Sequence, residues 1–242
     1  VAVKAGYVTK KDTISVTEDT EKTITMEKAP ESTRKDVSAA WKNFRNSDDN
    51  MGITSAKTPT SEATTYEKWF KKLGSGWGAA PSVQIIVDNS LIVMSANHIY
   101  KLDLNTGDIL QTGDMVAATN FGYTPPTYAD GMIFAPLADG RVQAFNAETL
   151  ESLWVYQDTL KGQSLSPITY SDGYIYTGFW NAETKDANYV CIPVTDEDPT
   201  NTQEAKEAAW QYTSLGGFYW AGSVVRGDYV VFGTDDGTSG SN

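Results

Sequence analysis

Four segments of this sequence share one pattern, in which a short polar turn separates two apolar runs. They are Val87-Asp-Asn-Ser-Leu-Ile-Val93, Tyr128-Ala-Asp-Gly-Met-Ile-Phe134, Tyr170-Ser-Asp-Gly-Tyr-Ile-Tyr176 and Val225-Arg-Gly-Asp-Tyr-Val-Val231. The first three begin at residues 87, 128 and 170, so they are 41 and 42 residues apart, and the fourth follows at 225. A fixed period of this length indicates stacked structural repeats. The Asp-Gly pairs supply the positive φ that a tight hairpin turn needs.

Each repeat continues with two more strand-like runs, for example Ile99–Leu110 and Val142–Leu153. A tryptophan recurs where the outermost strand should begin, at Trp69, Trp154 and Trp210. Four short strands in every forty or so residues are what a β-propeller blade requires, and we expect the tryptophan to pack between blades. The sequence therefore predicts an all-β chain with three complete blades at about 81–111, 125–157 and 165–213. It also predicts two strands of a fourth blade after Phe218, and outer strands of a preceding blade in Trp41–Leu73.

Three segments give the repeat a family likeness. Leu102-Asp-Leu-Asn-Thr-Gly107 matches the pattern Leu-Asp-x-x-Thr-Gly-x-x-x-Trp closely, although Leu110 replaces the expected Trp or its neighbour, and Phe145–Leu150 with Trp154 matches it more loosely. Trp41–Gly52 is similar to the opening segment of such chains. Over residues 38–242 the chain resembles the PQQ-like propeller repeat of quinoprotein alcohol dehydrogenases and of the bacterial outer-membrane assembly lipoprotein. A closed ring of that family needs more blades than this chain holds. We therefore expect a longer parent chain, or a second copy that pairs through open blade edges.

The first residues follow a different pattern. Thr13–Thr17 and Lys22–Met26 alternate with period two around a polar turn, which predicts a β-hairpin. We interpret residues 1–29 as the end of a small β-sandwich-like module, residues 30–37 as a linker and residues 38–242 as the propeller blades. Val1 is not an initiator methionine and no signal peptide precedes it, so we expect a mature form or a piece of a longer protein.

Charge and composition exclude several classes of function. A formal net charge of −12 argues against nucleic acid as a partner, because little is available to neutralise phosphates. No apolar run is long enough for a membrane span. The resemblance implies a quinone held between a tryptophan and a vicinal disulfide, with calcium beside it. A single cysteine excludes that disulfide, so we predict no cofactor and no metal.

Three further features have ordinary structural interpretations. Cys191 is expected to be a buried strand residue, and His98 a structural residue on an apolar strand rather than part of a catalytic triad. Asp196–Glu207 has the oxygen spacing of a calcium loop, but Pro199 stiffens it and Asn201 replaces the glycine that such a loop needs. A solvated insertion is the alternative that we favour for this segment.

The propeller topology points to one candidate binding surface. Loops that lead into each innermost strand, and loops between second and third strands, lie on the same face, and several carry aromatics beside glycines. The candidate ligand-binding residues are Trp77, Phe121, Tyr123, Gln163, Trp180, Asn181, Tyr219, Trp220, Asp235 and Asp236. Aromatics next to amides and carboxylates suit planar or sugar-like ligands. The alternative is that the rings plug the central channel.

These features together predict a non-catalytic binding or scaffold module of a larger bacterial cell-surface or secreted protein. Its ligand would be a carbohydrate or a protein at the funnel of the propeller. Two alternatives stay open: a quinoprotein-like dehydrogenase fragment whose cofactor site lies in missing blades, and a scaffold for protein assembly.

Overall fold

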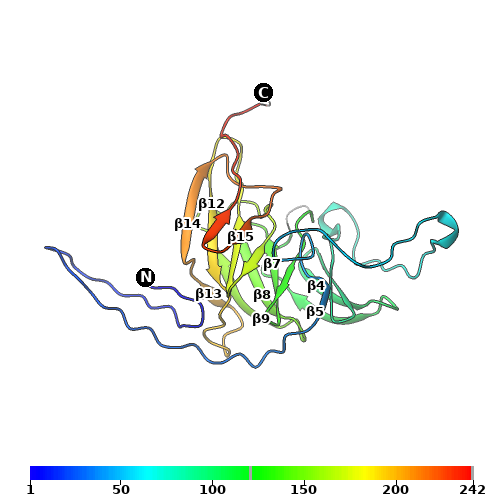
Figure 1. The fold of residues 1–242 in the computed structure, drawn as a ribbon, viewed down its shortest axis with the longest axis horizontal. Coiled ribbons are helices and arrows are strands. Elements are labelled where there is room, and N and C mark those ends of the chain that lie inside the picture. The colour runs from blue at the N-terminus through cyan, green and yellow to red at the C-terminus, as the bar shows by residue number, and fades with distance from the viewer. Residues whose placement is uncertain (120–121, 241–242) are drawn as a thin grey trace.

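The computed structural model describes residues 1–119 and 122–240, and most of its strands lie in three antiparallel blades (Figure 1). The first blade contains β2 (Ile85–Val87), β3 (Ser90–Ser95), β4 (His98–Asp103) and β5 (Ile109–Asp114). The second contains β6 (Thr127–Ala129), β7 (Met132–Leu137), β8 (Arg141–Asn146) and β9 (Ser152–Gln157). The third contains β10 (Thr169–Ser171), β11 (Tyr174–Gly178), β12 (Asp186–Pro193) and β14 (Trp210–Leu215). A final hairpin is formed by β15 (Val224–Arg226) and β16 (Tyr229–Val231).

This arrangement confirms the three predicted blades and the two strands of a fourth. The turn between the first two strands of a blade adopts the left-handed conformation at both central residues, as at Asp130 (φ 51°) and Gly131 (φ 71°). The third blade repeats this geometry at Asp172 (φ 52°) and Gly173 (φ 80°). The Asp-Gly signal in the sequence therefore fixes the turn type and, with it, the register of each hairpin.

The core lies between the blades rather than within any one of them. Ile85, Ile92 and Ile99 of the first blade pack with Ile133 and Phe145 of the second. On the other side of the second blade, Phe134 and Trp154 pack with Ile175, Phe179 and Val190 of the third. Each blade is covered only when its neighbours are present, which is the packing expected of a propeller.

Two tryptophans make the same kind of hydrogen bond to the blade that follows them in the chain. Trp154 Nε1 donates to the carbonyl of Val194 over 3.1 Å, and Trp69 Nε1 donates to the carbonyl of Leu104, also over 3.1 Å. In both cases the acceptor is the residue directly after the third strand of the next blade. At the interface between the first two blades the equivalent carbonyl belongs to Ala147, and it accepts from Lys101 Nζ over 3.2 Å.

The strand register identifies which residue replaces the missing tryptophan of the first blade. Trp154 is paired with Ala144, two residues before the end of β8, and Trp210 is paired with Cys191, two residues before the end of β12. The equivalent residue of β4 is Lys101, and its partner is Gln111. The tryptophan position is therefore taken by Gln111, and Leu110 is its neighbour.

Two expectations for the N-terminal half are wrong. The structure forms no strand in residues 1–38, where only the isolated bridges Ala2–Lys10 and Tyr7–Lys28 occur, so the predicted hairpin of Thr13–Met26 is an exposed loop. A lone hairpin is marginal in water, and Ile14 and Val16 find no surface to cover them. The segment Trp41–Leu73 also supplies no outer strand to a preceding blade. Instead β1 (Ala39–Trp41) pairs antiparallel with β2 at the inner edge of the first blade.

The insertion in the third blade also differs from the solvated loop that we expected. It leaves the third blade after β12 and forms β13 (Glu204–Lys206), which runs parallel to β9 of the second blade. The side chain of Lys206 is fully buried, with its Nζ 2.7 Å from Glu197 and 2.9 Å from Glu204. Nζ also lies 6.0 Å from the centre of the Trp154 ring. Buried charges persist only when they are paired, so these ion pairs allow Lys206 to be buried against Trp154 where β13 pairs with β9.

Two short 3₁₀ turns, η1 (Glu62–Thr64) and η2 (Trp77–Ala79), are the helical elements of the described residues. None of the described helices is long and apolar enough to cross a membrane.

Candidate functional site

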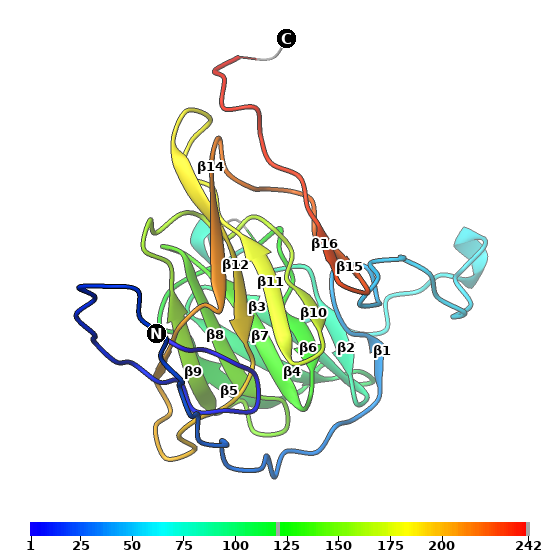
Figure 2. The same cartoon turned by 60° about the vertical axis from the view of Figure 1, so that its left-hand side comes forward.

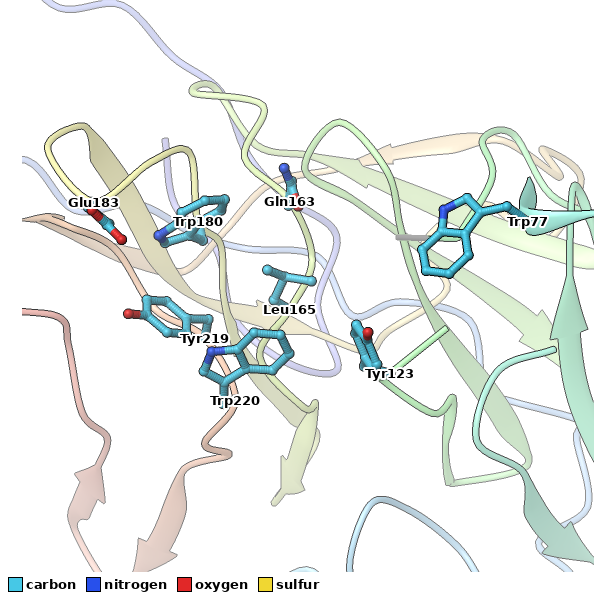
Figure 3. Close-up of a pocket in the computed structure, with 8 residues that line it drawn as sticks. All are labelled: Trp77, Tyr123, Gln163, Leu165, Trp180, Glu183, Tyr219 and Trp220. Carbon is cyan, nitrogen blue, oxygen red and sulfur yellow. The ribbon is translucent and has the colours of Figure 1, made fainter. Parts of the chain in front are cut away.

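Loops from several blades enclose a cavity of about 510 Å³ on one face of the molecule (Figure 3). Its wall consists of Trp77, Tyr123, Gln163, Leu165, Trp180, Glu183, Tyr219 and Trp220. Six of these were predicted from the sequence, and they come from five loops that are far apart in the chain. The propeller topology brings these loops together, as expected.

Backbone hydrogen bonds hold the loops that carry these side chains. Gln163 and Trp180 form an antiparallel bridge, with N···O distances of 2.7 and 3.0 Å. Trp220 N donates to the carbonyl of Leu165 over 3.2 Å. Trp220 adopts φ 64°, a left-handed conformation that is uncommon for a large side chain. The rings therefore project from a framework that fixes their backbone.

The aromatic rings form a continuous wall of edge-to-face contacts. Ring centres are 5.9 Å apart for Trp180 and Tyr219, 5.7 Å for Tyr219 and Trp220, and 5.5 Å for Trp220 and Tyr123. The corresponding interplanar angles are 74°, 88° and 71°. Trp77 lies across the cavity from this wall, beyond Tyr123 (Figure 3). Edge-to-face pairs of this kind are energetically favourable, so the rings form a continuous aromatic surface in the absence of a ligand.

Three rings of this site are exposed in the described part of the chain. Trp77 is 74% exposed, Trp220 54% and Tyr123 52%. The described part of the channel mouth thus leaves ring surface open to solvent.

Carboxylates lie beside the aromatic wall. Glu183 lines the cavity, and the hydroxyl of Tyr219 donates to Asp235 over 2.8 Å. That hydrogen bond is the largest cause of a raised pKa for Tyr219, with burial and the charges of Asp235, Glu183 and Asp236 adding to it. Hydrogen bonds from Thr238 lower the pKa of Asp236. The tyrosine therefore stays a neutral donor in a negative environment.

The other candidate residues lie apart from the cavity wall or outside the described residues. Asn181 donates from Nδ2 to the carbonyl of Asp186 over 2.7 Å, and Asp235 and Asp236 stand behind Tyr219. Phe121 is outside the described residues. Leu165 and Glu183 were not among the candidates, although Glu183 belongs to the same Trp180-Asn-Ala-Glu loop and its position in that loop was a usable signal.

The cysteine, the histidine and the calcium-like loop that the sequence analysis considered do not line the cavity. Cys191 is buried in β12, and burial raises the pKa of its thiol to about 12. His98 begins β4, at a half-exposed site rather than in a core, with Nδ1 2.9 Å from Asp114. In the calcium-like loop, Asp196 pairs with Arg34 over 2.7 Å and Glu204 accepts two backbone N–H groups. Among the described residues, no group of three or more His, Cys, Asp and Glu side chains is arranged to hold a metal ion.

Comparison with known proteins identifies the family to which this architecture belongs. A family model described as outer membrane protein assembly factor BamB matches residues 58–182, which is more than half of the chain. The chain belongs to this PQQ-like propeller repeat family. No curated protein matches it closely enough to add an activity.

Three solved structures are similar to this chain at low sequence identity. A europium-containing methanol dehydrogenase is 18% identical with a TM-score of 0.51, over 74% of this chain and 32% of that one. The computationally designed Ika4 protein is 16% identical with a TM-score of 0.50, over 70% of this chain and 96% of that one. BamB from Moraxella catarrhalis is 19% identical with a TM-score of 0.46, over 64% of this chain and 40% of that one. This PQQ-like chain thus spans less than half of either natural protein.

The residues of this PQQ-like chain do not fit the quinone site that the resemblance implies. That site needs a vicinal disulfide, whereas the one cysteine of the sequence, Cys191, lies in the third strand of a blade. It also needs a calcium-binding set, and the described residues contain none. Fold likeness alone does not transfer the activity.

Proposed function

We propose that this chain is a non-catalytic binding module of a larger bacterial cell-surface or secreted protein, with its ligand at the mouth of the propeller. The observation that carries the proposal is the wall of Trp180, Tyr219, Trp220 and Tyr123 in a cavity of about 510 Å³, where Trp220 and Tyr123 are exposed and the other two rings are half-buried. Binding sites are typically concave, mostly aromatic or apolar, and equipped with a few polar groups. Gln163 and Glu183 supply those polar groups here.

A pair of matched tryptophan variants tests this proposal. Trp220→Ala removes an exposed ring from the cavity, whereas Trp210→Ala removes an exposed ring from β14, away from the cavity. A panel of oligosaccharides and peptides is screened by ligand-observed NMR against both variants and the unmodified chain. We expect at least one ligand whose binding is lost in Trp220→Ala and retained in Trp210→Ala. Ligands that bind both variants equally well would show that the cavity is not the site.

A scaffold for protein assembly is the second candidate, and the edge of the third blade favours it. β14 ends its sheet (Figure 2), and it exposes Trp210 (39%), Tyr212 (52%) and Leu215 (49%). An uncovered apolar edge strand invites pairing with another chain, either the remainder of a parent protein or a second copy. The description of the matching family as an assembly factor supports the same interpretation.

Light scattering of the purified chain with small-angle scattering tests the second candidate. A compact dimer that Trp210→Ala dissociates would support pairing through this edge. A monomer at all concentrations would argue against a second copy as the partner. The two Trp variants are expected to separate the functions, because Trp210→Ala leaves the cavity intact.

A further inference from the structure

The cavity at the mouth of the propeller has carboxylates around it and no basic side chain in its lining. Glu183 lines it, and Asp235 and Asp236 stand behind Tyr219, so three carboxylates border one aromatic wall. None of the eight residues that line the cavity is a lysine or arginine. Lys161 and Lys185 belong to neighbouring loop segments, but neither lines the cavity.

The carboxylates are not neutralised by ion pairs with the described residues. Asp235 accepts from the hydroxyl of Tyr219 and Asp236 from Thr238, and the charge of Glu183 has no partner among the ion pairs of the described chain. Their influence is visible at Tyr219, whose pKa they raise together with the hydrogen bond to Asp235 and burial. Carboxylates without cationic partners make the electrostatic potential of the cavity negative.

The aromatic rings that line the cavity add to the attraction of positive charge. An ammonium or guanidinium group within about 6 Å of the centre of a Trp or Tyr ring is attracted by the negative face of that ring. The aromatic wall combines Trp180, Tyr219 and Trp220 within contact distance of one another, and Glu183 lies at its end (Figure 3). We propose that the cavity binds an organic cation, namely an alkylated ammonium or a guanidinium group, held by the rings of Trp180, Tyr219 and Trp220 and by the charge of Glu183.

Two other ligand classes fit these observations less well. A metal ion requires several oxygen or nitrogen ligands at short distance, and the described residues hold no such cluster. A neutral sugar suits the aromatic rings and can donate its hydroxyls to the carboxylates, but it leaves their negative charge uncompensated. The net charge of −12 further favours the approach of cations.

This inference rests on the proposed binding function, and the experiment separates the two. Choline is compared with 3,3-dimethyl-1-butanol, which has the same shape without the charge, and N-acetyl-arginine amide is compared with N-acetyl-citrulline amide. The first pair represents a small alkylated ammonium compound and the second a side chain of a partner protein. Binding is followed by tryptophan fluorescence and ligand-observed NMR. We expect at least one cation to bind about ten-fold more tightly than its neutral partner.

Glu183→Gln tests the charge of this residue directly. Glu183 is exposed and its side chain takes part in no described hydrogen bond, so we expect the substitution to leave the stability of the fold unchanged. We expect it to weaken binding of the cation about three-fold and to leave the neutral partner unchanged. Glu151→Gln removes the same charge from an exposed turn before β9, outside the cavity, and should change neither.

Each result decides between the two proposals. Equal binding of a cation and its neutral partner would overturn the cation site and leave an aromatic binding site. A neutral oligosaccharide that binds through Trp220, while neither cation binds, would also overturn it and support the proposed function. If none of the cations, neutral partners or oligosaccharides binds, both proposals fail.

Discussion

The strands β9 and β14 occupy the same position in successive blades, yet their surroundings are opposite. Both begin with similar sequences, Leu-Trp-Val-Tyr and Ala-Trp-Gln-Tyr. Trp154 of β9 is fully buried, because the third blade covers it and β13 lies beside its strand. Trp210 of β14 is 39% exposed, and no strand pairs with the free edge of β14 in the described part of the chain.

The difference shows that the repeat motif places a tryptophan on the outermost strand but does not determine whether that tryptophan is buried. The outermost strands of the second and third blades each present a tryptophan, and the N–H of Trp154 donates to a carbonyl directly after the third strand of the next blade, that of Val194. Trp210 presents the same group, but the described residues that follow it form the hairpin β15–β16 and no third strand whose carbonyl could accept from it. The same motif is therefore core at one interface and candidate interaction surface at the other.

The largest effect that tests this comparison is expected from Trp154→Ala. Removal of a fully buried ring leaves a cavity between two blades and an unpaired carbonyl at Val194. We expect the free energy of unfolding to fall by about 4 kcal/mol, measured by urea denaturation. Trp210→Ala is the control and should cost less than about 1 kcal/mol. Similar losses in both variants would show that β14 is covered in solution.

The next effect in size concerns the insertion that covers β9. Lys206→Met removes the buried amine and leaves Glu197 and Glu204 facing each other without a cation. We expect a loss of about 3 kcal/mol in the free energy of unfolding, because breaking a buried ion pair leaves the remaining charges buried without a partner. Lys11→Met breaks an exposed pair with Glu207 in the same region and should cost less than about 1 kcal/mol. Equal effects of the two variants would contradict the burial of this cluster.

The same cluster predicts a dependence on pH. Burial acts to raise the pKa of Glu197, but hydrogen bonds from Lys206 and Thr9 and the charge of Lys206 outweigh it and hold that pKa below its ordinary value of 4.5. A carboxylate with a lowered pKa stabilises the fold above 4.5, and this contribution is lost as the pH falls through the folded value. We expect Glu197→Gln to show a smaller loss of stability than the unmodified chain between about pH 6 and about pH 3, in parallel urea titrations. Identical pH profiles would show that Glu197 is not linked to folding.

The sequence predicted those parts of the fold that local chemistry determines. The Asp-Gly turns at Asp130 and Asp172 have one favourable geometry, so blades and hairpins followed from spacing alone. The path of residues 194–209 did not follow, because β13 pairs with β9 of the preceding blade and no local pattern specifies which strand an insertion joins. The N-terminal alternation was misleading for a related reason: period two indicates a strand only where another surface covers one face.

The candidate site was predictable to a similar degree. Topology alone placed Trp77, Tyr123 and Trp220 on one face, since their loops precede the innermost strands of the first blade, the second blade and the final hairpin. Sequence could not rank Glu183 above Asn181 in the same loop, because their directions depend on the bridge between Gln163 and Trp180. Three-dimensional contacts decide which side chain of a loop faces the cavity.

The smallest expected effect comes from the interface between the first two blades, where lysine replaces tryptophan as the donor. Lys101→Met removes the hydrogen bond to the carbonyl of Ala147, and we expect a loss of about 1 kcal/mol in the free energy of unfolding. Gln111→Trp restores the tryptophan of the repeat at the position that the register assigns to it. Because Trp69 and Trp154 reach the equivalent carbonyls, the double variant should recover the stability lost in Lys101→Met, as a double-mutant cycle by urea denaturation would measure. Additive effects of the two changes would mean that Gln111 is not the tryptophan position, and that the bond from Lys101 is unrelated to the repeat.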